Sequence, residues 1–128
     1  MLFDPCKPTV QMLGRFQPWH DGHTELFKRC HAKTGQVFIM IRQVSDSNDN
    51  PFDVETVKIN IIEGLAKEGF TLAEDYVIIV SPNIIDISYG RDVGYTITEH
   101  DLGKDIHNIS ASKIRKSMRE EGTLADKS

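Results

Sequence analysis

Three features that would indicate particular classes of protein are absent from this sequence. Its longest apolar run, residues 37–41, is far shorter than the ~20 residues that a membrane-spanning helix needs, and its first residues do not form a signal peptide. The two cysteines, Cys6 and Cys30, have neither the spacing of a metal site nor the pattern of a disulfide framework. Basic residues number 15 against 19 acidic ones, whereas a nucleic-acid-binding domain normally carries a basic patch. These absences predict a cytoplasmic protein with no membrane or nucleic-acid partner.

The remaining composition is that of an ordinary globular domain. Hydrophobic residues make up 39% of the 128 positions and charged residues 27%, which is enough for one hydrophobic core. We find no internal repeat and no domain boundary, so residues 1–128 are predicted to form a single domain. Periodicity and turn residues predict strands at 9–13, 36–42, 76–80 and 95–100, helices at 21–33, 54–68 and 110–121, and a short apolar strand or turn at 84–88.

The order of these elements predicts the fold class. Residues 37–41 form a continuous apolar run, which is typical of a buried strand in a parallel sheet. The strand, helix and strand over residues 9–42 make one βαβ unit, whose crossover is right-handed by default. We therefore expect an α/β fold with a mostly parallel sheet.

The segment between the first strand and the first helix reads GRFQPWHDGH, at residues 14–23. In an open α/β sheet this segment lies at the carboxyl end of the strand, where ligands bind. The start of the helix offers unpaired N–H groups and the positive end of its dipole, and Gly14 and Gly22 would let a phosphate approach the backbone closely. His20 and His23 are therefore candidates for phosphate contacts. The alternative is that they only cap or cover the start of the helix.

A second candidate phosphate site reads ISASKIR, at residues 109–115, and opens the last helix. Ser110 suits the N-cap position, and Ser112 and Arg115 lie in the first turns. A hydroxyl, a guanidinium and free N–H groups at one helix start can together bind an anion. The alternative is an ordinary capped helix whose arginine is solvated.

Both motifs resemble those of one family. HDGH, at residues 20–23, looks like the H-x-G-H signature of the cytidylyltransferase-like nucleotidyltransferases. The longer string from Gly14 most resembles the nicotinamide-mononucleotide (NMN) adenylyltransferases of the archaeal and bifunctional type. ISASKIR is similar to the I-S-x-[ST]-x-[IV]-R motif that ends the catalytic domain in that family. NPF, at residues 50–52, is similar to an Asn-Pro-Phe before the second helix of NMN adenylyltransferases, where an arginine usually follows and this chain has Val57 and Lys58.

This resemblance implies a Rossmann-like three-layer α/β/α sandwich and a nucleotidyltransferase reaction. A nucleoside monophosphate, with AMP from ATP favoured over CMP from CTP, would pass to a phosphorylated acceptor such as NMN, and pyrophosphate would leave. Mg²⁺ would bridge the nucleotide phosphates without a set of protein ligands. The residues implied to be catalytic are His20, His23 and Arg115. The residues implied to bind the nucleotide are Gly14, Arg15, Phe16, Gln17, His20, Gly22, His23, Ser110, Ser112 and Arg115.

The acceptor side of the site is predicted from fewer residues. The candidates for acceptor contacts are Trp19, Arg42, Asn50 and Arg91. Trp19, the single tryptophan, either stacks on a ring of the substrate or wedges between the first helix and a neighbouring loop. Arg42 and Arg91 fall at a strand end and in a loop, where an arginine is also often a plain surface residue. The remaining histidines show no ligand spacing and are predicted to face solvent, namely His31, His100 and His107.

Two other functions remain open at this point. One is a cytidylyltransferase that makes a CDP-alcohol or a CDP-sugar, although such enzymes usually carry an aspartate where Gln17 stands. The other is a non-catalytic, nucleotide-binding regulatory module that kept the pocket. Family members are often dimers or larger, so the resemblance leaves a homo-oligomer open as well.

Overall fold

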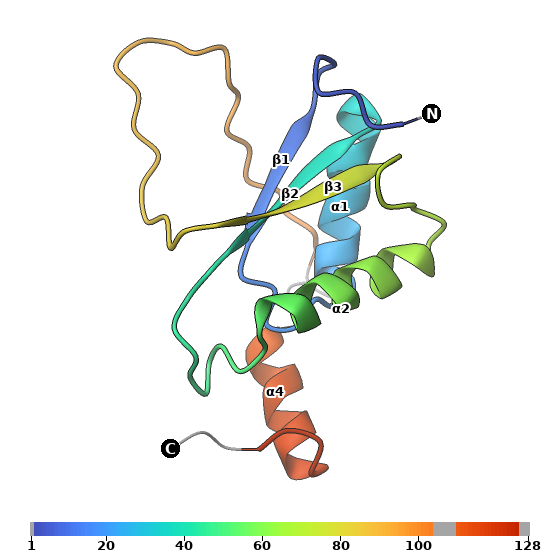
Figure 1. The fold of residues 1–128 in the computed structure, drawn as a ribbon, viewed down its shortest axis with the longest axis vertical. Coiled ribbons are helices and arrows are strands. Elements are labelled where there is room, and N and C mark those ends of the chain that lie inside the picture. The colour runs from blue at the N-terminus through green and yellow to red at the C-terminus, as the bar shows by residue number, and fades with distance from the viewer. Residues whose placement is uncertain (1, 104–109, 126–128) are drawn as a thin grey trace.

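The computed structural model describes residues 2–103 and 110–125 (Figure 1). Within these residues, three parallel strands form one sheet in the order β1-β2-β3. The elements are β1 (Val10–Gly14), α1 (Asp21–Thr34), β2 (Val37–Arg42), α2 (Val54–Ala66), β3 (Tyr76–Ser81) and α4 (Ala111–Glu120). Each of them confirms a predicted element, and the chain has a Rossmann-like α/β fold with an open parallel sheet. Within the described residues, no helix combines the length and apolar character needed to cross a membrane.

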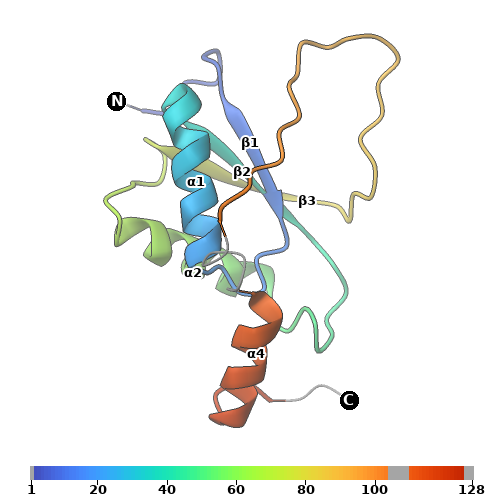
Figure 2. The same ribbon diagram turned by 180° about the vertical axis from the view of Figure 1, so that it is seen from behind.

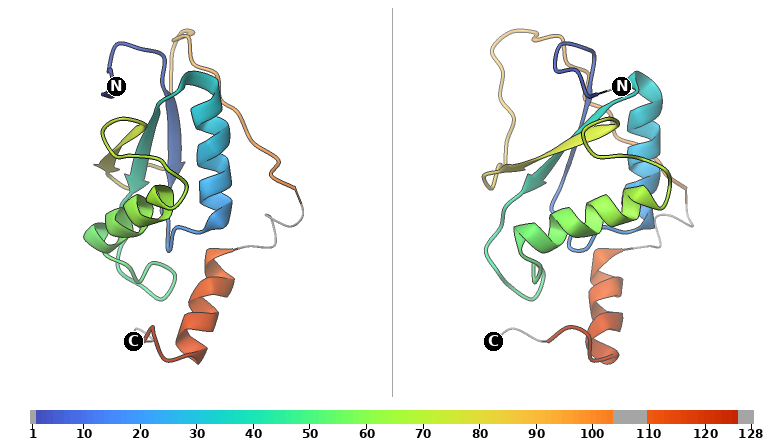
Figure 3. Two further views of the ribbon diagram at one scale, coloured as in Figure 1. Left: turned by 90° about the vertical axis from the view of Figure 1, so that its right-hand side faces the viewer. Right: turned by 45° about the vertical axis from the view of Figure 1, so that its right-hand side comes forward.

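The core lies between the sheet and the two helices that connect its strands. Because α1 joins β1 to β2 and α2 joins β2 to β3, two crossovers of the same hand place both helices on one face of the sheet (Figure 3). Fully burying one aliphatic or aromatic side chain contributes about 1.5–3 kcal/mol. The side chains buried there are Met12, Phe16, Trp19, Phe27, Cys30, Val37, Ile39, Ile41, Val57, Ile61, Leu65 and Tyr76. On the other face, Leu13 and Ile79 are exposed.

The last helix lies apart from this core. α4 begins beside the start of α1, beyond the carboxyl ends of β1 and β2, and runs away from the sheet (Figures 1 and 2). Its one buried residue is Arg115. The two helix starts that carry the predicted phosphate motifs are thus neighbours in space.

The segment 82–103 does not form the strand predicted at 95–100, and residues 84–88, predicted to be a strand or a turn, do not form a strand. It has no regular secondary structure, swings out from the end of β3 (Figure 1) and returns beside α1. Its isoleucines are exposed, Ile85 by 86% and Ile97 by 82%. The prediction is wrong because apolar alternation makes a strand only where a neighbouring strand supplies hydrogen bonds and a surface to pack against.

His31 was predicted to face solvent, and the structure corrects this. Its Nε2 lies 2.9 Å from Oδ1 of Asp75, and its ring packs against Phe70 with the centroids 5.0 Å apart. The pair ties α1 to the turn before β3, a partner 44 residues away that helical periodicity does not reveal. His100 is half-buried, and His107 lies outside the described residues.

Packing at the end of β1 requires a glycine. A Cβ built on Gly14 would lie 2.7 Å from Cε1 of Phe16. Phe16 is 2% exposed and has a φ of 55°, a left-handed conformation that costs about 1–2 kcal/mol for a residue with a side chain. Burial of its ring offsets that cost, so the ring cannot move away freely. Gly14 therefore has a packing role beside the phosphate approach predicted from the sequence.

We expect Gly14→Ala to lower the free energy of unfolding by about 1–3 kcal/mol, the usual effect of overpacking. Gly90→Ala is the matched control, because a Cβ at Gly90 would meet nothing within 4 Å, and its effect should stay within ~0.5 kcal/mol. Urea denaturation of the three proteins measures both changes. Equal midpoints for the two variants would contradict the packing role of Gly14.

Candidate nucleotide-binding site

The two histidines of the first motif begin α1 and bind its backbone with the same ring nitrogen. Nδ1 of His20 accepts a hydrogen bond from the backbone N–H of Gly22 at 3.0 Å, and Nδ1 of His23 accepts one from the N–H of His20 at 3.1 Å. The two rings stack with their centroids 3.8 Å apart. Because Nδ1 is an acceptor in both, we assign the proton of each neutral ring to Nε2. The two histidines therefore do cap the helix, as the alternative in the sequence analysis states. Each ring still has one N–H donor, at Nε2.

Electrostatics keep both rings neutral near pH 7. Burial lowers the pKa of His20, and the neighbouring carboxylate of Asp21 opposes this in part. Burial, and to a smaller extent the charge of a protonated His20, lowers the pKa of His23 to about 3. A positively charged ring would lose its Nδ1 acceptor and with it the bond to the helix backbone. The site therefore offers two neutral N–H donors at the positive end of a helix dipole.

Aromatic rings hold the histidine pair in place. The ring of His23 lies 5.0 Å from that of Phe16 and 5.3 Å from that of Trp19, between centroids. Trp19 is 8% exposed, and its Nε1 donates to Oγ1 of Thr24 at 2.9 Å. A Cβ on Gly64 would lie 3.0 Å from Cδ1 of Trp19, so the indole sits against α2. Trp19 thus wedges between α1 and α2, a helix where the sequence analysis expected a loop, and its stacking on a ring of the substrate stays a prediction.

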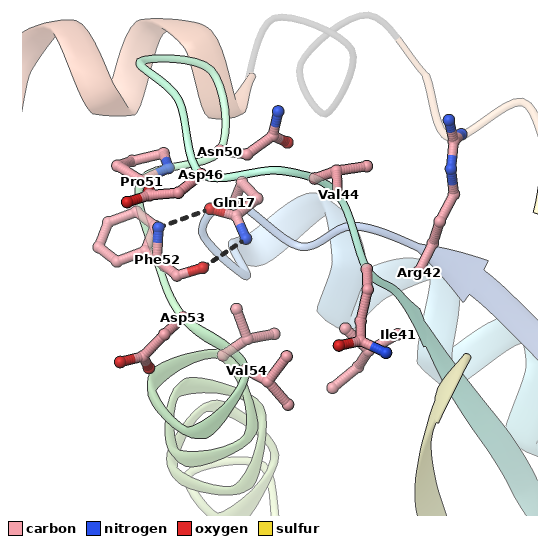
Figure 4. A pocket seen from close by; sticks show the side chains of 12 residues that line it. Gln17, Ile41, Arg42, Val44, Asp46, Asn50, Pro51, Phe52, Asp53 and Val54 are labelled. Atoms are coloured by element: carbon pink, nitrogen blue, oxygen red, sulfur yellow. Dashed lines mark hydrogen bonds between the residues drawn. The ribbon is translucent and has the colours of Figure 1, made fainter. Parts of the chain in front are cut away.

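Gln17 links the first motif to the start of α2. Its side-chain Nε2 donates to the carbonyl oxygen of Phe52 at 2.9 Å, and the N–H of Phe52 donates to its Oε1 at 2.9 Å (Figure 4). The amide thus pairs with the Phe52 backbone as a neighbouring strand would. The side chain, predicted to bind the nucleotide, is engaged in this structural pair, a role that the sequence analysis missed.

Arg115 brings the second motif to the same place. It is 5% exposed, its Nη1 donates to the carbonyl oxygen of Gln17 at 2.6 Å, and its Nη2 donates to Oγ of Ser112 at 3.2 Å. Ser110 is the N-cap of α4 and accepts the N–H of Lys113 at 3.2 Å. Burial lowers the pKa of the Arg115 guanidinium, which nevertheless stays charged at neutral pH. These contacts place the start of α4 against the first motif.

A cleft of about 360 Å³ opens beside Gln17, between the end of β2 and the start of α2. Arg42 and Asn50 line it from opposite sides (Figure 4). Nε of Arg42 donates to Oδ1 of Asn83 at 2.6 Å, and Nη1 of Arg15 donates to Oδ1 of Asn50 at 3.1 Å. Two predicted acceptor residues thus share one cleft. Arg91 does not line it and lies exposed in the 82–103 segment.

Comparison with known proteins shows the family to which this chain belongs. Residues 12–79, more than half of the chain, match the cytidylyltransferase-like family, and the chain belongs to that family. It is therefore a nucleotidyltransferase with a Rossmann-like domain. It is similar to nicotinamide-nucleotide adenylyltransferase 1 of Sulfolobus acidocaldarius, with 28% identity over 84% of this chain and 75% of that protein. It is also similar to the nicotinamide-nucleotide adenylyltransferase of Methanococcus aeolicus, with 36% identity over 46% of this chain and 36% of that protein.

The lowered pKa of His23 predicts a specific pH dependence of stability. Between pH 6.5 and about 3, an unfolded imidazole binds a proton that folded His23 does not, so the free energy of unfolding falls as the pH falls, by up to about 1.4 kcal/mol per pH unit. His23→Asn keeps an acceptor near the Nδ1 position and removes this titration.

We expect urea denaturation between pH 7 and pH 4.5 to give a shallower pH dependence for His23→Asn than for the unmodified chain. Carboxylates titrate in the same range in both proteins, so the difference between the two slopes isolates the imidazole. Identical slopes would contradict the lowered pKa.

Proposed function

We propose that this nucleotidyltransferase transfers AMP from ATP to a phosphorylated acceptor, NMN or a nucleotide like it, and releases pyrophosphate. The observation that carries the proposal is the bond from Arg115, on α4, to the carbonyl oxygen of Gln17. Gln17 lines the cleft and precedes by three residues His20, which stacks on His23 at the head of α1. The two adenylyltransferase relatives support the choice of ATP and of a nicotinamide nucleotide.

The chemistry needs alignment rather than a general base. An oxygen of the acceptor phosphate, already ionised near neutral pH, attacks the α-phosphorus of ATP, and pyrophosphate leaves as that bond forms. Negative charge builds on the phosphoryl oxygens in the transition state, and fixed N–H donors stabilise it. The Nε2–H groups of His20 and His23 are suited to this role because the rings are neutral and anchored through Nδ1. Neutral donors also release the product more readily than fixed charges would.

The leaving pyrophosphate would be bound at the start of α4. Arg115 uses part of its guanidinium on Gln17 and Ser112, and a planar fork with five donors keeps others for phosphate oxygens. Mg²⁺ carried by the triphosphate would supply further charge stabilisation. Within residues 2–103 and 110–125, no three His, Cys, Asp or Glu side chains are placed to hold a metal ion. Phosphate oxygens and water, the usual ligands of Mg²⁺ in such sites, would therefore hold it.

The acceptor is proposed to occupy the cleft beside Gln17. Its volume of about 360 Å³ lies within the range of small-molecule sites. Arg42 and Asn50 supply a cation and an amide at its rim, which suits a phosphorylated molecule with polar substituents.

A panel of substrates tests the reaction. Pyrophosphate release is measured with ATP or CTP, each combined with NMN, an alcohol phosphate or a sugar phosphate. We expect release with ATP and NMN. Release with CTP and an alcohol or sugar phosphate would instead identify a cytidylyltransferase, and tight nucleotide binding without release from any pair would identify a regulatory module.

Two isosteric variants of His20 separate its capping role from its donor role. His20→Asn keeps an acceptor near Nδ1, and asparagine is a favourable N-cap, so stability should change by less than ~1 kcal/mol. It removes the Nε2–H donor, so kcat should fall about a hundredfold. His20→Gln keeps an N–H near Nε2 and loses the cap, so it should lose more stability and less turnover. A fully active His20→Asn would contradict the proposed role.

A further inference from the structure

Three arginines meet three consecutive residues of the loop after β2. Nη1 of Arg15 donates to Oδ1 of Asn50 at 3.1 Å. Nη2 of Arg119 donates to the carbonyl oxygen of Asn48 at 2.6 Å, and Nη2 of Arg115 lies 3.6 Å from Oδ1 of Asp49. We call Arg15, Arg115 and Arg119 the arginine cluster. Its members come from the first motif and from α4, and each faces one oxygen of the 48–50 segment.

The cluster concentrates positive charge in a chain that is acidic overall. Arg115 and Arg119 are four residues apart on α4, where like charges on one helix face repel. The nearby charges of Arg119 and Arg15 lower the pKa of Arg115, and that of Asp49 raises it, so these groups lie within electrostatic reach of one another. The carboxylate facing Arg115 comes from a side chain that is 82% exposed. Because this carboxylate is exposed and on a loop, an anion with more negative charge can displace it from Arg115.

The three loop oxygens contact guanidinium groups in the two ways in which phosphate oxygens do in proteins. The oxygens of Asn48 and Asn50 accept N–H bonds, and the carboxylate of Asp49 forms an ion pair with Arg115. Phosphates carry more charge than one carboxylate and two neutral amide oxygens, so they should compete well for the same donors. Arg115 also belongs to the site where the leaving pyrophosphate is placed in the proposed function, and Arg119 lies about one turn further along α4, in its last turn.

We infer that Arg119 is a further polyphosphate-binding residue of this site, and that Asp49 occupies the arginine cluster as an internal substitute for phosphate until the nucleotide displaces it. This inference rests on the proposed function for the identity of the polyphosphate as the β- and γ-phosphates of the nucleotide. Arg119 lies outside the ISASKIR motif, and its role is read from its contact with the 48–50 segment.

Binding of inorganic pyrophosphate tests the inference without any turnover. Isothermal titration calorimetry of the full chain, at 0.15 M salt and without divalent cations, compares four proteins. Arg119→Gln should weaken pyrophosphate binding about tenfold, the loss of a charge-assisted contact. Asp49→Asn, which is isosteric, should tighten it severalfold. Lys116→Gln removes the same charge from an exposed position of the same helix and should change the affinity less than about twofold.

AMP provides a second readout that separates contact from structure. Because AMP has no β- or γ-phosphate, Arg119→Gln should bind it as the unmodified chain does, whereas a merely structural role for Arg119 would weaken both ligands equally. If Arg119→Gln unfolds, Arg119→Lys keeps the charge without the fork and should show an intermediate loss of pyrophosphate affinity.

Three outcomes would overturn the inference. The first is an Arg119→Gln variant that matches Lys116→Gln, the second is an Asp49→Asn variant that binds pyrophosphate no better than the unmodified chain, and the third is equal weakening of AMP and pyrophosphate. Pyrophosphate release in the substrate panel tests the proposed function separately. Pyrophosphate effects without turnover would support the anion site and reject the transferase reaction, and turnover without these effects would reject this inference alone.

Discussion

One hydrogen bond, from Nη1 of Arg115 to the carbonyl oxygen of Gln17, sets the geometry of the site. Arg115 is the buried residue of α4, so this contact decides where the helix starts relative to the first motif. The side chain of Gln17 meanwhile pairs with the backbone of Phe52 and positions the loop that leads into α2. The backbone and the side chain of one residue thus place two helices. Without either bond, the imidazoles, the guanidinium and the cleft would lose their common orientation.

Docking a helix through a buried arginine favours accurate placement over stability. Removing a guanidinium from water costs free energy, which good hydrogen-bond geometry offsets only in part. An apolar contact would tolerate many rotations of α4, because hydrophobic burial is not directional. The planar guanidinium of Arg115 keeps its hydrogen bonds in only a few rotations of the helix. Such a constraint suits a group that has to face a phosphate chain, and it explains why α4 stands outside the hydrophobic core.

The histidine pair solves a related problem at the start of α1. A serine or an aspartate would satisfy the free N–H groups of the helix equally well. An imidazole does so with Nδ1 and still presents an N–H at Nε2. Burial against Phe16 and Trp19 lowers the pKa of His23 to about 3 and so keeps that ring neutral. One arrangement of the two rings therefore caps the helix, packs against the core and supplies hydrogen-bond donors. Capping the helix and contacting a phosphate, set out as alternatives for His20 and His23 in the sequence analysis, are compatible.

The strands β1 to β3, the helices α1, α2 and α4 and the two motifs could be predicted from the chain alone, because periodicity and capping residues such as Ser110 act within a few positions. The hydrogen-bonded pairs that build the site could not be predicted in this way. Gln17 meets Phe52 across 35 residues and Arg115 across 98, and an amide or a guanidinium carries no local sign of its partner. The prediction of a strand at 95–100 is wrong for the same reason. Alternating apolar and polar residues indicate that one face can be buried, but they do not indicate whether a neighbouring strand is there to cover it. Local chemistry selects the elements, whereas polar contacts between distant residues form only when packing brings the two groups together and excludes the water that would otherwise bind them.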